Sequence, residues 1–375
     1  VVRIVNLLIR RAAELGASDI HLEAFERRLR LRYRVDGVLQ EADAPPAELR
    51  AAIVSRIKIM ARLDIAENRL PQDGRVKTAA LGRPLDLRVA TTPTLHGEGV
   101  VIRLLDRAGL VLDFDALGVD ETARAALFPL IGRSNGVLLV TGPTGSGKTT
   151  TLYAMLERLN LTERKIVTVE DPVEYQLEGV NQIQARPQIG LGFAEALRSI
   201  LRQDPDVIMI GEIRDLETAR IAVQAALTGH LVLATLHTNS AAAAINRLRD
   251  MGIADYLLAA TVIGGVAQRL LRRLCPDCAE PDPAPAVEAG ISGAFRRPVG
   301  CASCAGAGYR GRVAALEVLT ADDALRRLIL DGADEMTIEA AAERGGMRTL
   351  RAHALQRAAA GETSLAEVAR VAAGL

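Results

Sequence analysis

Residues 142–149 read Gly142-Pro143-Thr144-Gly145-Ser146-Gly147-Lys148-Thr149, which has the spacing G-x-x-x-x-G-K-[ST], and they directly follow the apolar run 137–140. Glycines let the backbone curl tightly, so that its N–H groups point inward at a phosphate chain. Lys148 would supply a positive charge for the β- and γ-phosphates, and the Thr149 hydroxyl would bind Mg²⁺. A helix opening at Thr150 would turn its positive end toward the same anion. The sequence predicts a strand before the loop and a helix after it. We therefore predict a nucleotide-binding loop over Gly142 to Thr150 rather than a chance glycine-rich turn.

Short, wholly apolar runs alternate with helical patterns from about residue 119 onward. Four such runs stand out: Val137–Val140, Ile166–Val169, Val207–Ile210 and Leu231–Ala234. Runs of this kind are typical of parallel strands that are buried on both faces. Each leads directly into polar residues, and in open α/β sheets ligands bind beyond the carboxyl ends of the strands. The pattern predicts an α/β domain over 119–271 with its chemistry at one sheet edge.

Two carboxylates at these strand ends are candidates for catalysis. Glu212 follows the run 207–210, and Glu170 ends the run that begins at Ile166. Hydrolysis of a γ-phosphate requires an acceptor that positions the attacking water. We assign the magnesium-facing role to Glu212, partly through water, beside Thr149, and we leave open which carboxylate is the general base. For Glu170 the alternative is an ordinary loop or helix start.

A histidine, His237, follows the fourth apolar run. It is either a sensor of the γ-phosphate, a relay to a neighbouring subunit, or a structural group, and its spacing leaves these readings open.

The first hundred residues have a different pattern. A helical stripe over 3–15 ends at Gly16, and a second apolar helix covers Leu49 to Met60. Alternating strands are expected at 18–23 and 29–35, with a hairpin turn at Asp36-Gly37, and again at 84–90 and 100–105. The order α-β-β-α-β-β predicts a small α+β domain over 1–106, joined by a linker at 107–118.

Two arginines of this domain lie on the opposite face from their apolar strand neighbours. Arg88 alternates with Leu87 and Val89, and Arg103 alternates with Ile102 and Leu104. Composition alone favours solvated strand positions for both. The alternative is that they reach an anionic partner.

All four cysteines of the chain fall into two C-x-x-C pairs, Cys275 with Cys278 and Cys301 with Cys304. Two such turns complete a closed tetrahedral Zn²⁺ site without an open catalytic position, whereas free thiols or disulfides are the alternatives. We predict a zinc-binding subdomain over 272–312. From 313 to 375 the Ala, Leu, Arg and Glu spacing predicts a C-terminal helical part.

Composition narrows the class of protein. Lys plus Arg and Asp plus Glu both number 46, which argues against a protein that coats nucleic acid. No apolar run approaches a membrane span, and the start is not a signal peptide, so we expect a cytosolic protein. Since the first residue is Val, we also expect a segment upstream.

The assembled motifs resemble the secretion ATPase superfamily, and within it the ATPases of type II secretion systems. The stretches that carry this resemblance are Gly16–His21, Arg34–Gly37, Leu70–Arg75, the phosphate loop, an aspartate box at Glu170–Glu174, Arg202–Asp206, Gly211-Glu212, a histidine box from Thr228 to Asn239, and Cys301–Arg312. The resemblance implies a RecA-like core, ATP and Mg²⁺ as ligands, and a homo-hexameric ring. It also implies that Arg88 and Arg103 reach the nucleotide when the small domain closes.

The resemblance further implies pseudopilus assembly and protein export at the cytoplasmic face of the inner membrane, with recruitment by the secretion platform. A type IV pilus assembly motor is the nearest alternative. A nucleic-acid translocase is disfavoured because single-strand channels need basic grooves and stacking aromatics, and only 3% of the residues are aromatic. A nucleotide-gated scaffold without turnover is a third possibility.

Overall fold

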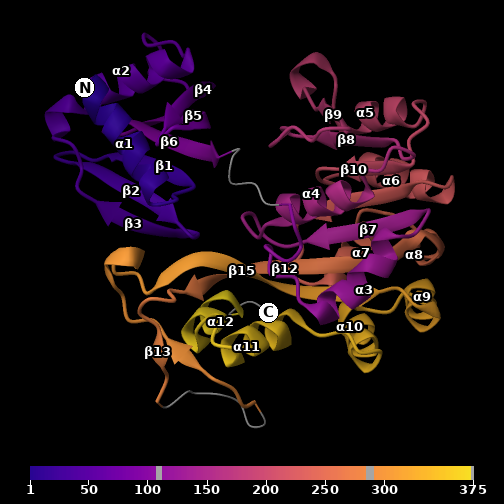
Figure 1. Cartoon of the computed structure of the whole chain (residues 1–375). Coiled ribbons are helices and arrows are strands. Elements are labelled where there is room, and N and C mark those ends of the chain that lie inside the picture. The colour runs from indigo at the N-terminus through magenta and orange to yellow at the C-terminus, as the bar shows by residue number, and fades with distance from the viewer. Residues whose placement is uncertain (107–111, 284–290, 373–375) are drawn as a thin grey trace. The chain divides into compact units, whose positions relative to one another are not determined.

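The structure, a computed structural model, describes residues 1–106, 112–283 and 291–372 (Figure 1). The chain divides into two compact units, Val1–Leu110 and Val111–Leu375, which we describe separately. Residues 107–111 of the expected linker and residues 284–290 of the expected zinc-binding subdomain lie outside the described residues.

The first unit is a six-stranded antiparallel sheet with two helices. The helices are α1 (Val2–Glu14) and α2 (Arg50–Ala61), and the strands are β1 (Asp19–Ala24), β2 (Leu29–Val35), β3 (Val38–Ala42), β4 (Gln72–Ala80), β5 (Arg83–Thr94) and β6 (Gly97–Asp106). Their spatial order is β3-β2-β1-β6-β5-β4. Ile20, Leu22 and Leu87 on the strands are buried together with Ile53 and Ile57 of α2. The expected α+β architecture with an antiparallel sheet is confirmed.

Two local features of this unit differ from the prediction. Strand β4 was not expected, because only Val76 of its nine residues is buried and an edge strand of this kind carries little alternation. In addition, β5 ends at Thr94 and β6 begins at Gly97, so both strands are longer than the expected 84–90 and 100–105 and a tight turn joins them.

The second unit is built on a seven-stranded sheet in the order β15-β12-β7-β11-β10-β8-β9. Its strands are β7 (Gly136–Thr141), β8 (Ile166–Glu170), β9 (Asn181–Gln184), β10 (Val207–Ile210), β11 (Leu231–Leu236), β12 (Val262–Leu274) and β15 (Tyr309–Thr320). The four predicted strands, β7, β8, β10 and β11, are parallel neighbours at its centre. Helices α3 (Glu121–Ile131), α4 (Lys148–Leu159), α5 (Phe193–Ile200), α6 (Leu216–Leu227), α7 (Ala241–Asp250) and α8 (Asp255–Thr261) complete this part of the unit.

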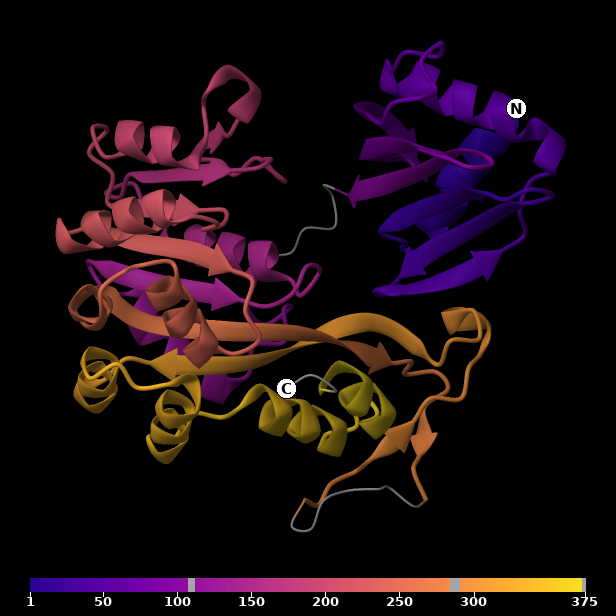
Figure 2. The ribbon, with the colours of Figure 1, turned by 180° about the vertical axis from the view of Figure 1, so that it is seen from behind.

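The long strands β12 and β15 form an antiparallel pair that extends the sheet beyond β7 (Figure 2). The chain between them carries the four cysteines and a short ladder of β13 (Glu280–Pro281) with β14 (Arg296–Arg297). Residues 313–320 are therefore strand and not helix, contrary to our expectation for the C-terminal part. An Ala- and Leu-rich run that is buried on both faces has no periodicity that separates strand from helix.

Four helices follow β15, as expected for the C-terminal part: α9 (Asp323–Leu330), α10 (Glu335–Arg344), α11 (Leu350–Ala359) and α12 (Leu365–Ala372). Helices α11 and α12 pack along the β12–β15 pair (Figure 1). Among the helices of the described ranges, none is both long and apolar enough to cross a bilayer.

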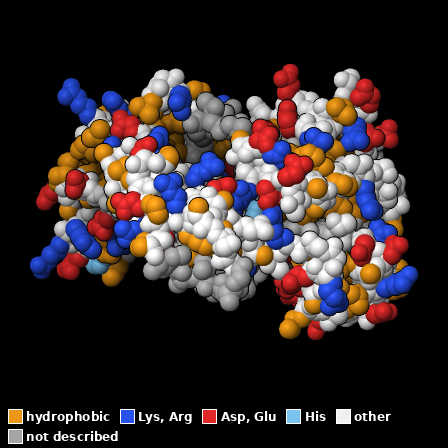
Figure 3. Space-filling model, turned by 60° about the horizontal axis from the view of Figure 1, so that its bottom comes forward, with side chains coloured by type: hydrophobic (Ala, Val, Ile, Leu, Met, Phe, Trp, Pro, Cys, Tyr) orange, Lys and Arg blue, Asp and Glu red, His pale blue; other side chains and the backbone are white. Residues whose placement is uncertain are grey.

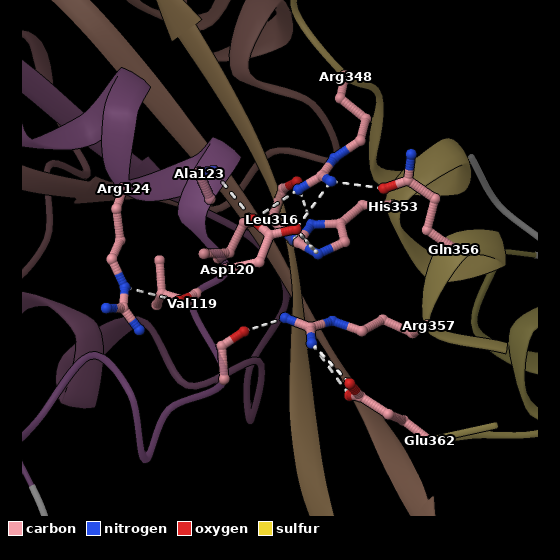
Figure 4. A network of polar contacts seen from close by, with 11 residues as sticks. Val119, Asp120, Ala123, Arg124, Leu316, Arg348, His353, Gln356, Arg357 and Glu362 are labelled. Carbon is pink, nitrogen blue, oxygen red and sulfur yellow. Dashed lines mark hydrogen bonds and ion pairs between the residues drawn. The ribbon is translucent and has the colours of Figure 1, made fainter. Parts of the chain in front are cut away.

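A buried polar network ties α11 to the residues just before α3 (Figure 4). Asp120 caps α3 and pairs with Arg348 Nη1 at 2.8 Å, and its Oδ2 lies 3.3 Å from His353 Nε2. The main-chain N–H of Leu316 donates to His353 Nδ1 at 3.0 Å, so the histidine also touches β15. Arg357 donates to the carbonyl of Gly118. The start of the second unit is thereby fixed to its last helices.

This network predicts a pH-dependent stability. Burial lowers the pKa of His353 to about 4, with Arg348 and Arg357 acting in the same direction and Asp120 against them. An unfolded histidine has a pKa near 6.5, so between about pH 6.5 and 4 the unfolded chain binds a proton that the native chain does not. Stability should fall as the pH drops through this window, by up to about 3 kcal/mol from this group. Thermal unfolding of wild type and His353→Asn at pH 7 and 4.5 checks this, since the variant should lose less stability on acidification. Equal losses would assign the acid sensitivity to other groups.

Candidate nucleotide site

The predicted phosphate loop connects β7 to α4. Gly142 and Gly147 have φ angles of 146° and 91°, which L-residues with a side chain rarely adopt. A Cβ at Gly142 would also lie 2.6 Å from the Ser146 hydroxyl and from the carbonyl oxygen of Gln268. Glycine is thus required at both positions by conformation and by space, since a Cβ at Gly147 would lie 2.7 Å from Gln268 Nε2.

Lys148 is folded back onto this loop. Its Nζ donates to the carbonyl oxygens of Gly142 at 2.8 Å and Pro143 at 3.0 Å. Burial lowers its pKa to about 8, opposed by the carboxylate of Glu212 and assisted by the charge of Arg269. The ammonium group is held where an anion cradled by the loop would meet it.

Other residues of the loop fit a bound nucleotide. Thr149 is exposed at the start of α4, with its hydroxyl available for a metal ion. Ser146 Oγ is buried and makes no hydrogen bond within the described chain, as expected for a group that would be satisfied by a ligand or by loop closure. Pro143, Thr144 and Gly145 form the exposed tip. These residues would hold the phosphates, and Thr149 would hold the Mg²⁺.

Glu212 and His237 lie at the ends of the neighbouring strands β10 and β11. Their side chains approach to 3.6 Å between His237 Nε2 and Glu212 Oε2, and Glu212 also pairs with Arg214. Burial lowers the pKa of His237, and the charge of Lys148 acts in the same direction. Lys148, Glu212 and His237 are therefore brought together at one sheet edge, with the histidine neutral near pH 7.

Glu170 lies in a different environment. Its carboxylate is buried and accepts hydrogen bonds from Tyr153 at 2.5 Å, Thr168 at 2.6 Å and Gln182 at 3.0 Å. Burial and the neighbouring carboxylate strongly raise the pKa of Tyr153, which keeps this hydrogen bond in its neutral donor form. The network ties α4, which follows the loop, to β8 and β9.

Arg88 and Arg103 face each other in register on β5 and β6 of the first unit. Arg103 Nε donates to Asp19 Oδ1 at 3.0 Å, and Arg34 lies 3.7 Å from the other oxygen of this buried carboxylate. Composition alone favoured solvated positions for these arginines, and the family resemblance implied contact with the nucleotide; in the structure Arg103 has an acidic partner within its own unit. Contact of Arg88 and Arg103 with nucleotide stays a prediction.

The four cysteines form one cluster. Their sulfurs all lie within 4.8 Å of one another, with separations of 3.9 Å for Cys275 to Cys301 and 3.7 Å for Cys301 to Cys304. Two thiolates bound at about 2.3 Å to one tetrahedral zinc ion are about 3.8 Å apart, whereas a disulfide is about 2 Å long. Backbone N–H groups of Gly300 and Gly308 donate to Cys278 and Cys304, as is typical around thiolate ligands. The cluster matches a closed four-thiolate metal site.

Comparison with known proteins adds to this geometry. Residues 1–370 match the family described as Type II/IV secretion system protein. Type II secretion system protein E of Xanthomonas campestris is 56% identical over 380 residues, which cover 99% of this chain and 67% of that protein. Type II secretion system ATPase E of Vibrio cholerae is 50% identical over 378 residues, covering 99% of this chain and 75% of that protein. The chain belongs to the type II/IV secretion system protein family.

A solved relative supports the same fold for this secretion ATPase. The crystal structure of the pilus retraction motor PilT with bound ADP is 29% identical, has a TM-score of 0.67, and covers 97% of this chain and 96% of that one. The family resemblance stated from the motifs is thus confirmed, and so are the ATPase class and the α/β fold.

Several residues around the site were not found by sequence reasoning. Gln268 and Arg269 form a polar pair within an otherwise apolar run of β12, and that interruption was the available signal. Arg269 is buried and donates to Asn239 Oδ1 at 3.0 Å. Arg214 and Tyr153 carried no signal of their own, because their partners are set by tertiary contacts.

The cysteine cluster gives a prediction about metal content. We expect one tightly bound zinc ion per chain, and we expect Cys275→Ser or Cys301→Ser to lose it and to loosen residues 272–312 locally. Nucleotide affinity should be retained, since the cluster lies outside the strand ends that carry the loop. Metal analysis of the native purified protein, with ADP titration of each variant, checks both parts. Native protein without zinc would contradict the assignment.

Proposed function

We propose that this secretion ATPase hydrolyses Mg²⁺-bound ATP as a homo-hexamer and powers pseudopilus assembly and protein export in a type II secretion system. The observation that carries the proposal is the convergence of Lys148, Glu212 and His237 beside the phosphate loop. Such a site combines an anion cradle, a cation for the phosphates and a carboxylate acceptor.

Residues of the phosphate loop and of the neighbouring strand end have separate roles in this reaction. Loop amides and Lys148 bind and orient the phosphates, and Glu212 accepts the proton of the attacking water or orients it. Bound Mg²⁺, held by Thr149 and through water by Glu212, would neutralise charge on the phosphate oxygens. Arg214 pairs with Oε1 of Glu212, whereas Oε2, which faces His237, would be the oxygen that meets the water.

In this proposal Glu170 is a positioning residue and not the general base. Its buried carboxylate already accepts from three protein donors, Tyr153, Thr168 and Gln182, which hold it in a fixed orientation between α4, β8 and β9. His237, neutral and partly exposed, is suited to sense the γ-phosphate through the carboxylate it faces.

Phosphate release from ATP with and without Mg²⁺ tests the activity, and it also separates an enzyme from a nucleotide-gated scaffold. A type IV pilus motor is the second candidate, favoured by the likeness to PilT. The higher identity to type II secretion proteins favours export. Complementation of a type II secretion ATPase deletion, compared with that of a pilus-assembly ATPase deletion, decides between them.

The charges on the face drawn in Figure 3 and the net charge do not favour nucleic-acid translocation. Acidic and basic side chains are interspersed on the face drawn in Figure 3, and the net charge is zero. Turnover that rises with added DNA would reverse this reading.

The proposed setting is the cytoplasmic face of the inner membrane, where a platform protein would recruit the ring. Turnover measured with and without the cytoplasmic part of that platform protein tests the partnership, and sedimentation with a non-hydrolysable ATP analogue tests the hexamer.

A further inference from the structure

We infer that Gln268 of β12 is a positioning residue that holds the phosphate loop in its nucleotide-binding shape. The inference rests on the proposed function, in that the loop binds nucleotide. It assigns a role in that site to a strand that follows the core α/β elements in sequence.

The first observation is a buried hydrogen bond between Gln268 and α4. The Thr151 hydroxyl donates to Gln268 Oε1 at 2.6 Å, and the two side chains are 1% and 2% exposed. Thr151 lies in the first turn of α4, three residues after Lys148. This hydrogen bond joins the start of α4, which follows the loop, to β12.

The second observation is that Gln268 fills the space at both glycine hinges of the loop. Its main-chain carbonyl oxygen lies 2.6 Å from the point where a Gly142 Cβ would be, and its side-chain Nε2 lies 2.7 Å from the corresponding point of Gly147. The side chain of Leu270, on the same strand, lies 3.5 Å from that point of Gly147. One residue therefore contacts the loop where it leaves β7 and where it enters α4.

Strand register explains how β12 reaches the loop. Ala267 pairs with Thr141, the last residue of β7, so Gln268 lies one position beyond the end of that strand, beside the start of the loop. Gln268 and Arg269 project to opposite faces because side chains alternate along a strand. The first contacts the loop, and the second contacts Asn239 after β11.

The two polar atoms of the Gln268 side-chain amide differ in their hydrogen bonding. Within the described chain, Oε1 accepts from Thr151 whereas Nε2 donates to no other residue. A carboxylate in its place would keep the acceptor for Thr151 but would put negative charge against a loop that binds phosphates. The amide is therefore the suitable group here, and the chemistry predicts different defects for different substitutions.

Nucleotide affinity of the full chain tests this inference. We expect Gln268→Leu and Thr151→Val each to raise the Kd for ADP by roughly tenfold, since each leaves a buried partner unpaired. The Kd of the double variant for ADP should be no higher than that of the single variant with the higher Kd, because both changes remove the same hydrogen bond. Thr151→Ser, which keeps the hydroxyl, should bind ADP with nearly the wild-type Kd. Gln268→Glu should bind ADP more weakly than Gln268→Leu. Gln224→Leu, at an exposed position on α6, is the matched control.

The outcomes separate this inference from the proposed function. If wild type binds ADP but releases no phosphate from ATP, the ATPase proposal fails while the ADP affinities still decide the role of Gln268. If Gln268→Leu binds ADP and turns over ATP as wild type does, the positioning role is wrong and the ATPase proposal stands. Additive losses in the double variant would also overturn the inference, because they would show that the two side chains act independently.

Discussion

Lys148→Ala is expected to abolish ATP hydrolysis and weaken nucleotide binding, whereas Glu212→Gln should bind nucleotide and lose turnover. The Lys148 ammonium has only carbonyl oxygens as partners in the loop, so its removal costs contacts with both the bound and the reacting phosphates. Glutamine at position 212 keeps the size and the polar contacts of the side chain but cannot accept the water proton. We expect a loss of about 10²–10⁴-fold in kcat for Glu212→Gln, the usual range for a general base.

Two controls make this test specific. Glu157→Gln removes a carboxylate from the exposed face of α4 and should leave kcat unchanged. Glu170→Gln should lower stability more than it lowers kcat, because it disturbs the Tyr153, Thr168 and Gln182 network without facing Lys148. Phosphate release and ADP affinity are measured for each variant. Near-normal turnover in Glu212→Gln, with loss in Glu170→Gln, would exchange the two roles.

The centre of the fold was predictable because its signals are local. The phosphate loop has a fixed spacing, and the buried parallel strands are apolar on both faces, so each could be read from a few consecutive residues. The cysteine pairs are equally local. The phosphate loop and the polar residues that follow the parallel strands were then expected at one sheet edge, since ligands bind at the carboxyl ends of such strands.

The misread elements lack such local signals. Strand β15 has apolar residues on both faces and alanines that suit either structure, so only its pairing with β12 makes it a strand. Strand β4 is an edge strand with one buried residue. Among the site residues, Gln268 touches the loop only because Ala267 pairs with Thr141, and Asp19 meets Arg103 only through the register of β1 with β6. Register is a tertiary property, and the sequence pattern does not contain it.

Arg103→Ala and Arg88→Ala are each expected to lower kcat steeply, by about 10³-fold or more if these guanidiniums stabilise charge on the transferring phosphoryl group. Affinity for ADP should change far less, because the charge matters most in the transition state. Zinc content and the thermal stability of the second unit should not change, because both arginines belong to the first unit.

The buried Asp19 provides the control that separates chemistry from structure. It lies between Arg103 and Arg34, which hold it from neighbouring strands at 3.0 Å and 3.7 Å. If Arg103 serves only to balance this carboxylate, then Arg34→Ala should damage the protein as Arg103→Ala does, in stability and turnover alike. If Arg103 acts on the nucleotide, Arg34→Ala should lose some stability but keep kcat, and only Arg103→Ala should lose turnover at unchanged ADP affinity. The measurements are kcat, ADP affinity and the thermal midpoint of Arg34→Ala and Arg103→Ala. Equal kcat values in the two variants would assign Arg103 a structural role. Loss of ring assembly with unchanged kcat would make Arg103 an interface residue.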